Sequence, residues 1–214
     1  MSLSARRLVA VTQRVDAFPE RREVRDALDQ RLSQWLYEGG LLPLPVPNGL
    51  APGADHNGAL AQWVARTGVE GIVLSGGGDI GKDPARDRTE RWLLEHARTA
   101  GLPVLGICRG MQMLAVFFGG ALVPVSGHVA KRHSLVVAGD DKAAWPEEVN
   151  SFHDLGIAAC PSDFEPRAQA PDGSVEAFVH KTLGWEGWMW HPEREATFND
   201  IDTARLRALM GDAE

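Results

Sequence analysis

Residues 102–118 read LPVLGICRGMQMLAVFF, and they predict a sharp turn between a buried strand and a helix. The apolar run 102–107 has the length of a buried strand, and 109–118 has a helix-like pattern. Gly106 and Gly110 flank Cys108 at two residues on either side, as a tight, closely packed turn requires. This Gly-x-Cys-x-Gly frame predicts a nucleophile elbow, in which the turn presents a reactive side chain.

Cys108 would stand just before the first turn of that helix, where the helix dipole favours thiolate over thiol. The alternative is a small core residue, which most free cysteines are. We favour a nucleophile because the frame specifies the surroundings as well as the residue. Cys160 has no such surroundings, and we interpret it as structural.

A cysteine nucleophile needs a base and a group that orients the base. The aromatic and apolar run 184–190 predicts a strand that stops at Pro192, which cannot donate to a sheet ladder. His191 and Glu193 are two residues apart, so both can point to one side of the chain. Glu193 would then hold the imidazole of His191 in the tautomer that accepts a proton from Cys108.

A glycine-rich loop, SGGGD at 75–79, follows the strand-like run 71–74. Consecutive glycines let backbone N–H groups turn towards a ligand. An N–H from Gly77 or Gly78, together with the N–H of Arg109, would form an oxyanion hole. Residues 76–82, GGGDIGK, also fit a phosphate-binding loop, but Asp83 replaces the required Ser or Thr, and Pro84 disfavours a helical Asp83.

Strand and helix patterns alternate along the first half of the chain. This order predicts an α/β protein with a three-layer, flavodoxin-like, doubly wound and mostly parallel sheet, and ligands at the carboxyl ends of its strands. Short runs in the C-terminal half predict additional antiparallel strands. We expect strands at 8–13, 41–46, 71–74, 103–108, 133–138, 147–152, 175–179 and 184–190, and helices at 23–38, 58–67, 89–100, 109–118 and 200–210.

Composition limits the classes of function. The 214 residues favour one domain over 1–214, and 44% hydrophobic with 24% charged residues is ordinary for a globular protein. A net charge of −7 argues against general nucleic-acid binding. The apolar stretch 113–125 is too short to span a membrane, and no secretory signal is visible. With two distant cysteines, these features predict a cytoplasmic location.

The remaining histidines and tryptophans are interpreted as structural. His128, His133 and His153 have no zinc-like spacing with cysteine, so we predict no metal and no cofactor, and satisfied histidines on a strand-rich surface. The alternative is that one or more of them line the pocket. Glu176 and His180 form an alternative base–acid pair without a strand-ending context.

Three tryptophans precede His191. Strand alternation places Trp188 and Trp190 on one face and Trp185 with His191 on the other. Trp185 is therefore the tryptophan expected to face the site.

Taken together, these motifs resemble a class I glutamine amidotransferase-like domain of the γ-glutamyl hydrolase branch, peptidase family C26. The segments that resemble it are 75–79, 105–112, 149–153 and 191–193, in the family's order. The resemblance implies a catalytic triad of Cys108, His191 and Glu193. It also implies that the glutamyl group is held by the elbow glutamine and the Val-Asn-Ser segment with its neighbours, here Gln112, Ser151, Phe152 and His153.

The N-terminal segments 13–15, 20–22 and 27–31 resemble a subset of that family often found among surface-polysaccharide genes. A basic rim is a candidate grip for a phosphate-bearing or acidic leaving group. The alternative is solvated charges balanced by nearby acids. The rim residues are Arg14, Arg21, Arg22, Arg25, Lys131 and Arg132.

The expected reaction is hydrolysis of a γ-glutamyl amide through a γ-glutamyl thioester on Cys108, with release of glutamate and an amine. The alternative is a glutaminase subunit that supplies ammonia to a partner synthetase; a homodimer is a further candidate assembly. A redox or stress protein of similar architecture usually carries histidine directly after the cysteine, where Arg109 stands here. A non-catalytic binding subunit would have no need for the complete triad.

Overall fold

An eight-stranded sheet forms the centre of the computed structural model, which describes residues 6–51, 53, 58–139 and 144–211. Its first five strands are mutually parallel and the last three antiparallel. The parallel part has the flavodoxin-like order, so the predicted fold class is confirmed. The strand order is β4 (Leu41–Pro45), β1 (Arg7–Val11), β5 (Gly71–Leu74), β6 (Val104–Ile107), β14 (Trp185–Trp188), β13 (Val175–His180), β12 (Phe164–Gln169) and β9 (Val136–Val137).

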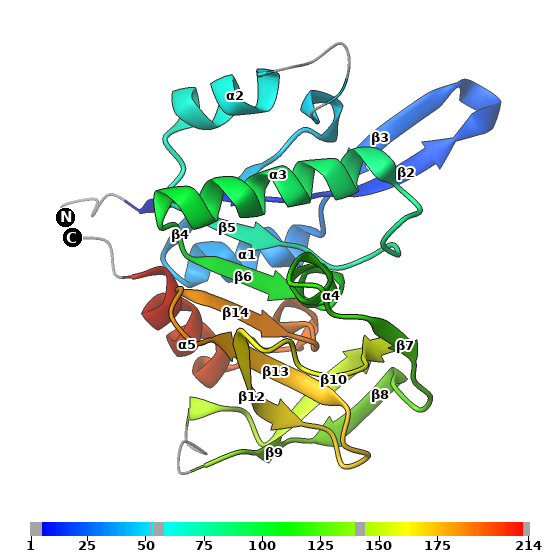
Figure 1. Ribbon diagram of the computed structural model, residues 1–214, viewed down its shortest axis with the longest axis vertical. Helices are drawn as coiled ribbons and strands as arrows, with labels where there is room; N and C mark the ends of the chain where they lie inside the picture. The colour runs from blue at the N-terminus through cyan, green and yellow to red at the C-terminus, as the bar shows by residue number, and fades with distance from the viewer. Residues whose placement is uncertain (1–5, 52, 54–57, 140–143, 212–214) are drawn as a thin grey trace.

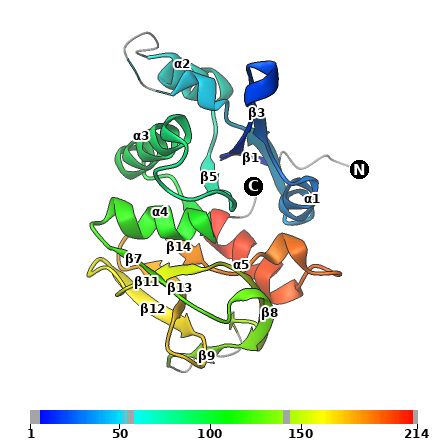
Figure 2. The same ribbon diagram turned by 90° about the vertical axis from the view of Figure 1, so that its right-hand side faces the viewer.

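Helices cover both faces of this sheet. Figure 1 and Figure 2 show α2 (Ala59–Thr67), α3 (Pro84–Ala100) and α4 (Arg109–Phe117) on one face. The other face carries α1 (Gln30–Glu38) and α5 (Asp200–Met210). Two separate apolar clusters fill the spaces between the layers, with Leu93 and Met113 in the first and Trp35 and Leu206 in the second. The architecture is therefore three-layered.

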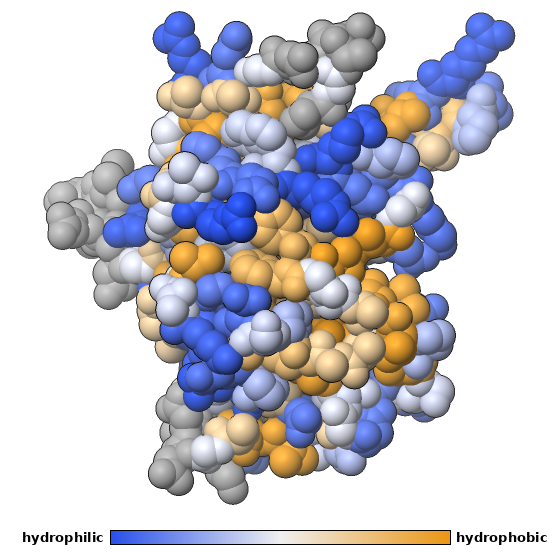
Figure 3. Space-filling model, in the orientation of Figure 1, coloured by the Kyte–Doolittle hydropathy of each residue, from blue (hydrophilic) through white to orange (hydrophobic). Residues whose placement is uncertain are grey.

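The predicted helix 23–38 is wrong in its first part. Residues Glu23–Ala27 form β3, which pairs antiparallel with β2 (Arg14–Phe18), and α1 begins only after Asp29. The Asp29 side chain accepts a hydrogen bond from the Arg31 N–H and so caps the helix. Val24, which fitted the helical pattern, is 69% exposed and therefore does not pack in the core. Figure 3 shows hydrophilic residues at the tip of this projecting hairpin.

The C-terminal half also departs from expectation. The strand predicted at 184–190 is β14, which pairs antiparallel with β13, as expected, but parallel with β6 on its other side. Two small antiparallel sheets lie beside the main one, formed by β8 (Val129–Ser134) with β10 (Glu148–Phe152) and by β7 (Leu122–Pro124) with β11 (Leu155–Ile157). Single-turn 3-10 helices occupy Pro19–Arg21, Asn48–Leu50 and Pro192–Arg194.

Helix α3 begins at Pro84, earlier than predicted, because proline is favoured at the first helical position. Asp83 remains non-helical, at φ −119° and ψ 86°, as the following proline requires. Within the described residues, none of the helices has the length and apolarity to cross a membrane. Because β5, β6 and β14 are adjacent and parallel, the segments that follow them meet at one edge of the sheet.

Candidate active site

Cys108 occupies a strained turn between β6 and α4. Its φ of +51° and ψ of −106° are rare for a residue with a side chain, and such outliers concentrate at functional sites. A Cβ on Gly106 would lie 2.6 Å from the Gly110 carbonyl oxygen, and one on Gly110 would lie 2.1 Å from the Leu74 carbonyl oxygen. Both flanking glycines are therefore required by close packing, as predicted from the sequence.

His191 follows β14 and is buried beside Glu193. Its Nδ1 lies 2.7 Å from Glu193 Oε1, and Asn150 fixes its backbone by accepting from the His191 N–H at 3.0 Å and donating to its carbonyl at 2.8 Å. Arg31 donates to the Glu193 carbonyl at 2.8 Å. These contacts hold the imidazole and carboxylate in one arrangement.

The environment of His191 favours its protonated form. Burial lowers the pKa of this imidazole, but hydrogen bonds to Cys108 and Glu193, and the charges of both groups, outweigh burial and raise its pKa to about 9. Near neutral pH the ring therefore has a proton to donate. This is the property that a general acid needs when an amine leaves.

The glycine loop is held by Arg86, a buried side chain on α3. Its guanidinium donates to the carbonyl oxygens of Ser75 at 2.7 Å and Gly76 at 3.2 Å, and to that of Gly77. Gly77 and Gly78 have φ of +83° and +72°, which favour glycine. The loop carbonyls are thus drawn towards Arg86.

The same loop packs directly on the imidazole. A Cβ on Gly76 would lie 2.6 Å from His191 Cε1. The loop, the elbow and the His191–Glu193 pair therefore belong to one site at the carboxyl edge of the sheet.

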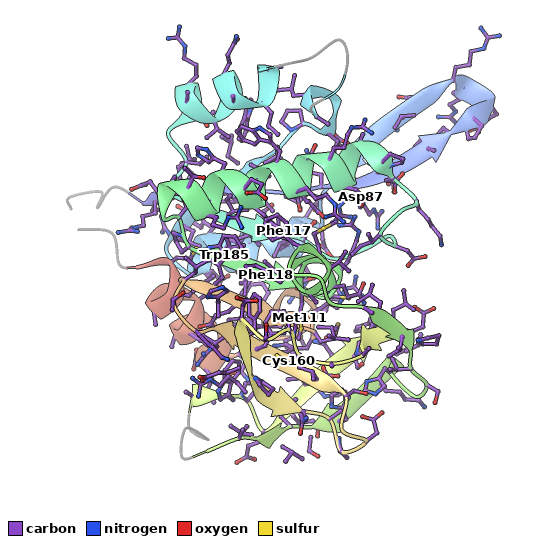
Figure 4. The ribbon with its side chains drawn as sticks, viewed as in Figure 1. Asp87, Met111, Phe117, Phe118, Cys160 and Trp185 are labelled. Atoms are coloured by element: carbon purple, nitrogen blue, oxygen red, sulfur yellow. The ribbon has the colours of Figure 1, made fainter. Side chains whose placement is uncertain are left out.

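A buried carboxylate joins the loop to the elbow. Glu90 accepts from Arg86 Nε at 2.9 Å, from Thr12 Oγ1 at 2.9 Å and from Arg109. Arg109 also contacts Asp87, which Figure 4 labels. Arg86 and Glu90 were not predicted as site residues. Their only signal in the sequence is an i, i+4 pair of opposite charges, a spacing that is common on exposed helix faces.

Two predicted substrate residues lie close to the elbow and the imidazole. Gln112 donates from Nε2 to the Leu155 carbonyl at 2.8 Å. The ring of Phe152, 41% exposed, meets that of His191 edge-on with centroids 5.9 Å apart.

Ser151 and His153 face elsewhere. Ser151 Oγ lies 3.3 Å from His128 Nδ1, and His153 Nε2 lies 3.4 Å from Glu176 Oε1. Substrate binding by these four residues stays a prediction.

The interpretation of the three histidines as satisfied surface residues is wrong, and the alternative Glu176–His180 pair does not form. His128 and His153 are buried with Glu176, and the Nε2 atoms of His133 and His153 have no hydrogen-bond partner among the described residues, so they are not satisfied surface histidines. Glu176 does not pair with His180, whose Nδ1 accepts from backbone N–H groups at 182 and 183.

Trp185 does not face the site. Its ring packs near Phe117 and Phe118 at centroid distances of 6.3 and 5.8 Å, and its Nε1 donates to the Leu102 carbonyl at 3.0 Å (Figure 4). Trp185 begins a strand that is parallel to β6, so it lies at the edge opposite the elbow. Trp188 and Trp190 stack at 5.5 Å, which confirms that they share a face.

Most of the predicted basic rim is paired with acids. Arg14 lies 3.1 Å from Asp16, Arg25 lies 2.6 Å from Glu23, and Arg132 donates to Glu195 at 2.9 Å. These pairs favour solvated, balanced charges. Arg14 also lines a small cavity of about 50 Å³ together with the glycine loop, His191 and Glu193.

Residues 8–193 match the sequence profile of the Peptidase C26 family, and the chain belongs to this family. It is 33% identical over 139 residues to gamma-glutamyl-CDP-amidate hydrolase of Campylobacter jejuni subsp. jejuni serotype O:2, covering 62% of this chain and 66% of that protein. It is 32% identical to the glutamine-hydrolyzing GMP synthase subunit of Methanothrix thermoacetophila, covering 58% and 67%. The structure of PurLQS from Thermotoga maritima has the same fold, with a TM-score of 0.65 and 20% identity over 96% of this chain and 98% of that one.

Proposed function

We propose that the chain is an enzyme that hydrolyses γ-glutamyl amide bonds, releasing glutamate and an amine. The observation that carries this proposal is that Cys108, on a strained strand–helix turn, interacts with His191, which is paired with the buried Glu193. The raised pKa of His191, about 9, supports a proton donor next to a cysteine.

The reaction has two steps. Cys108 Sγ attacks the δ-carbon of the γ-glutamyl amide, the C–N bond breaks, and His191 gives its proton to the departing amine. A γ-glutamyl thioester remains on Cys108. His191 then takes a proton from water, the hydroxyl attacks the thioester, and glutamate leaves as the proton returns to the Cys108–His191 pair. Glu193 orients the ring throughout.

The oxyanion would be stabilised by N–H groups of Gly77 or Gly78 and Arg109. Arg86 supports this assignment because it binds the loop carbonyl oxygens. The N–H groups of the same peptides then point the opposite way, where they can bind an oxyanion. Gln112 and Phe152, which lie beside the elbow and the imidazole, are the proposed glutamyl-binding residues, whereas Ser151 and His153 face the Glu176 cluster.

The proposed leaving group is a phosphate-bearing amine, of the kind that the name of the Campylobacter relative describes. Support comes from Arg14, which lines the cavity that contains His191 and whose Cδ lies 3.5 Å from the position of a Cβ on Gly77. A guanidinium binds phosphate oxygens well at such a place.

A second candidate is a glutaminase subunit that supplies ammonia to a partner synthetase. The similarity to the Methanothrix GMP synthase subunit favours it. In that case the leaving amine is ammonia, and full activity would need the partner chain.

Glutamate release separates the two functions. The chain would be incubated with glutamine, γ-glutamyl-CDP-amidate and simple γ-glutamyl alkylamides, with a protein-free blank, and glutamate measured by mass spectrometry. Preferred release from the phosphate-bearing substrate supports the hydrolase. Release from glutamine alone supports the glutaminase. Release from none of them, with or without a synthetase partner, contradicts both.

A further inference from the structure

Three imidazoles surround one buried carboxylate beside the candidate active site. His128 directly precedes β8, His133 lies on β8, His153 directly follows β10, and Glu176 lies on β13. From Glu176 Oε1 the distances are 3.5 Å to His128 Nδ1, 3.7 Å to His133 Nε2 and 3.4 Å to His153 Nε2. Strand pairing thus brings together side chains from three separate segments of the sequence.

The outer nitrogen of each ring faces an oxygen acceptor. His153 Nδ1 lies 3.2 Å from the Leu155 carbonyl, and His133 Nδ1 lies 3.2 Å from the Ser134 carbonyl. A carbonyl oxygen can only accept, so each Nδ1 carries the hydrogen and each Nε2 presents a lone pair to Glu176.

His128 is oriented by a carboxylate instead. Its Nε2 lies 2.9 Å from Asp172 Oδ2, which leaves Nδ1 facing Glu176 and Ser151 Oγ. A carboxylate that holds the outer nitrogen of a histidine is a common support for metal-binding imidazoles.

Except for His128 Nδ1, which lies 3.3 Å from Ser151 Oγ, the inner atoms of the cluster have no hydrogen-bond partner among the described residues. Glu176 is 0% exposed, and neither of its carboxylate oxygens has a partner in the described part of the chain; the same is true of Nε2 in His133 and His153. A buried carboxylate is rarely left in this state, because desolvation without compensation is strongly unfavourable. A positive charge between these atoms would satisfy all of them at once.

The spacing matches coordination better than hydrogen bonding. Separations of 3.4 to 3.7 Å are long for charge-assisted hydrogen bonds. Ligand atoms about 2.1 Å from a tetrahedral ion lie ~3.4 Å from one another. The ligand atoms of His128, His153 and Glu176 all lie within 4.8 Å of one another, whereas His133 joins this group only through its 3.7 Å separation from Glu176 Oε1.

We propose that the chain binds one divalent transition-metal ion, Zn²⁺ foremost, through His128 Nδ1, His153 Nε2 and Glu176 Oε1, with His133 Nε2 moving in as the fourth ligand. Imidazole with one carboxylate suits zinc, and four protein ligands with no open position define a structural site. The ion would join the small β8–β10 sheet to β13 of the main sheet. It would thereby position β10, whose Asn150 holds the backbone of His191.

Metal content tests the proposal directly. The full chain, without an affinity tag, would be purified and its zinc measured by elemental mass spectrometry. We expect about one ion per chain, and a loss of most of it in Glu176→Gln and His133→Gln. His96→Gln is the matched control, because His96 stacks on Trp92 of α3 and touches none of the four ligands. It should retain its zinc.

If the purified chain contains no metal, titration with added metal ions tests the same site. Chelator-treated chain would be titrated with Zn²⁺ by calorimetry and with Co²⁺ by visible absorption, with circular dichroism to confirm folding. Binding that raises the melting temperature of the parent chain but not of His133→Gln supports the site. Folded chain that binds neither ion, or equal binding in both ligand variants, overturns it. These readouts do not depend on the proposed hydrolase activity.

Discussion

His191 and His153 are both buried histidines beside a glutamate, yet their surroundings differ. His191 Nδ1 lies 2.7 Å from Glu193, and Cys108 and Glu193 both raise the pKa of the ring. His153 Nε2 lies 3.4 Å from Glu176 and has no hydrogen-bond partner among the described residues. The first arrangement suits proton transfer, whereas the second suits a bound cation. The same pair of residue types therefore supports different chemistry, depending on which atoms remain free.

The largest effect is expected at the proton-transfer pair. His191→Gln should lower the rate of γ-glutamyl amide hydrolysis by about 10³-fold or more, because the leaving amine loses its proton donor. Steady-state kinetics would measure it. The control variant Glu186→Gln changes a buried glutamate on β14, the strand that precedes His191, and should keep most of the activity. Near-normal rates in His191→Gln would remove His191 from the mechanism.

The pH dependence of the hydrolysis rate tests whether His191 acts as a proton donor. His191 must be protonated to release the amine, and its pKa is raised to about 9, so the rate should fall as pH rises through about 9. Because this pKa is higher in the folded chain than the ordinary 6.5, protonated His191 stabilises the fold. That contribution is complete below pH 6.5 and is lost as pH rises through about 9. Glu193→Gln removes the negative charge that raises this pKa and leaves only a neutral acceptor for His191 Nδ1.

The alkaline limb of the Glu193→Gln rate profile should therefore move to lower pH. An unchanged limb in that variant would show that Glu193 does not set the protonation of His191.

The buried ion pairs behind the glycine loop should affect stability. Glu90→Gln leaves Arg86 and Arg109 without a buried counter-charge that both now contact. We expect a loss of about 3–5 kcal/mol in the free energy of unfolding, measured with urea. Glu95→Gln on the exposed side of α3 should change it by less than about 1 kcal/mol. Equal effects would mean that Glu90 does not anchor the loop.

The smallest effect is expected at a carboxyl outside both histidine regions. Burial raises the pKa of Asp202 to about 7. Between pH 3.8 and about 7, the Asp202 carboxyl stays protonated in the folded chain but is ionised in the unfolded chain. The free energy of unfolding therefore falls as pH rises through this range. Asp202→Asn keeps an acceptor for Trp190 Nε1 and should stabilise the chain more at pH 8, where Asp202 is ionised, than at pH 5, where it is protonated. Thermal unfolding at pH 5 and 8 would check this, and equal shifts at both values would contradict it.

The elbow could be predicted because its determinants are local. Gly106, Cys108 and Gly110 specify the turn within five residues, and the alternation of strands and helices specifies the parallel sheet. The hairpin strand 23–27 was missed because Val24 fits a helical pattern and yet lies in solvent.

The histidine cluster was missed for a different reason. Its four residues come from separate strands and loops, and only strand pairing between β8 and β10, and packing near β13, brings them together. Arg86 and Glu90 were missed because burial, which gives their ion pair its importance, is not visible in an i, i+4 spacing.

The central claim is that Cys108 is the nucleophile, and the rate of glutamate release by Cys108→Ala tests it most directly. The matched control is Cys160→Ala, since burial raises the pKa of the Cys160 thiol to about 11 and keeps it a thiol. We expect release at the blank rate for Cys108→Ala and near-parental release for Cys160→Ala, with both chains folded. Parental release by Cys108→Ala would contradict the claim.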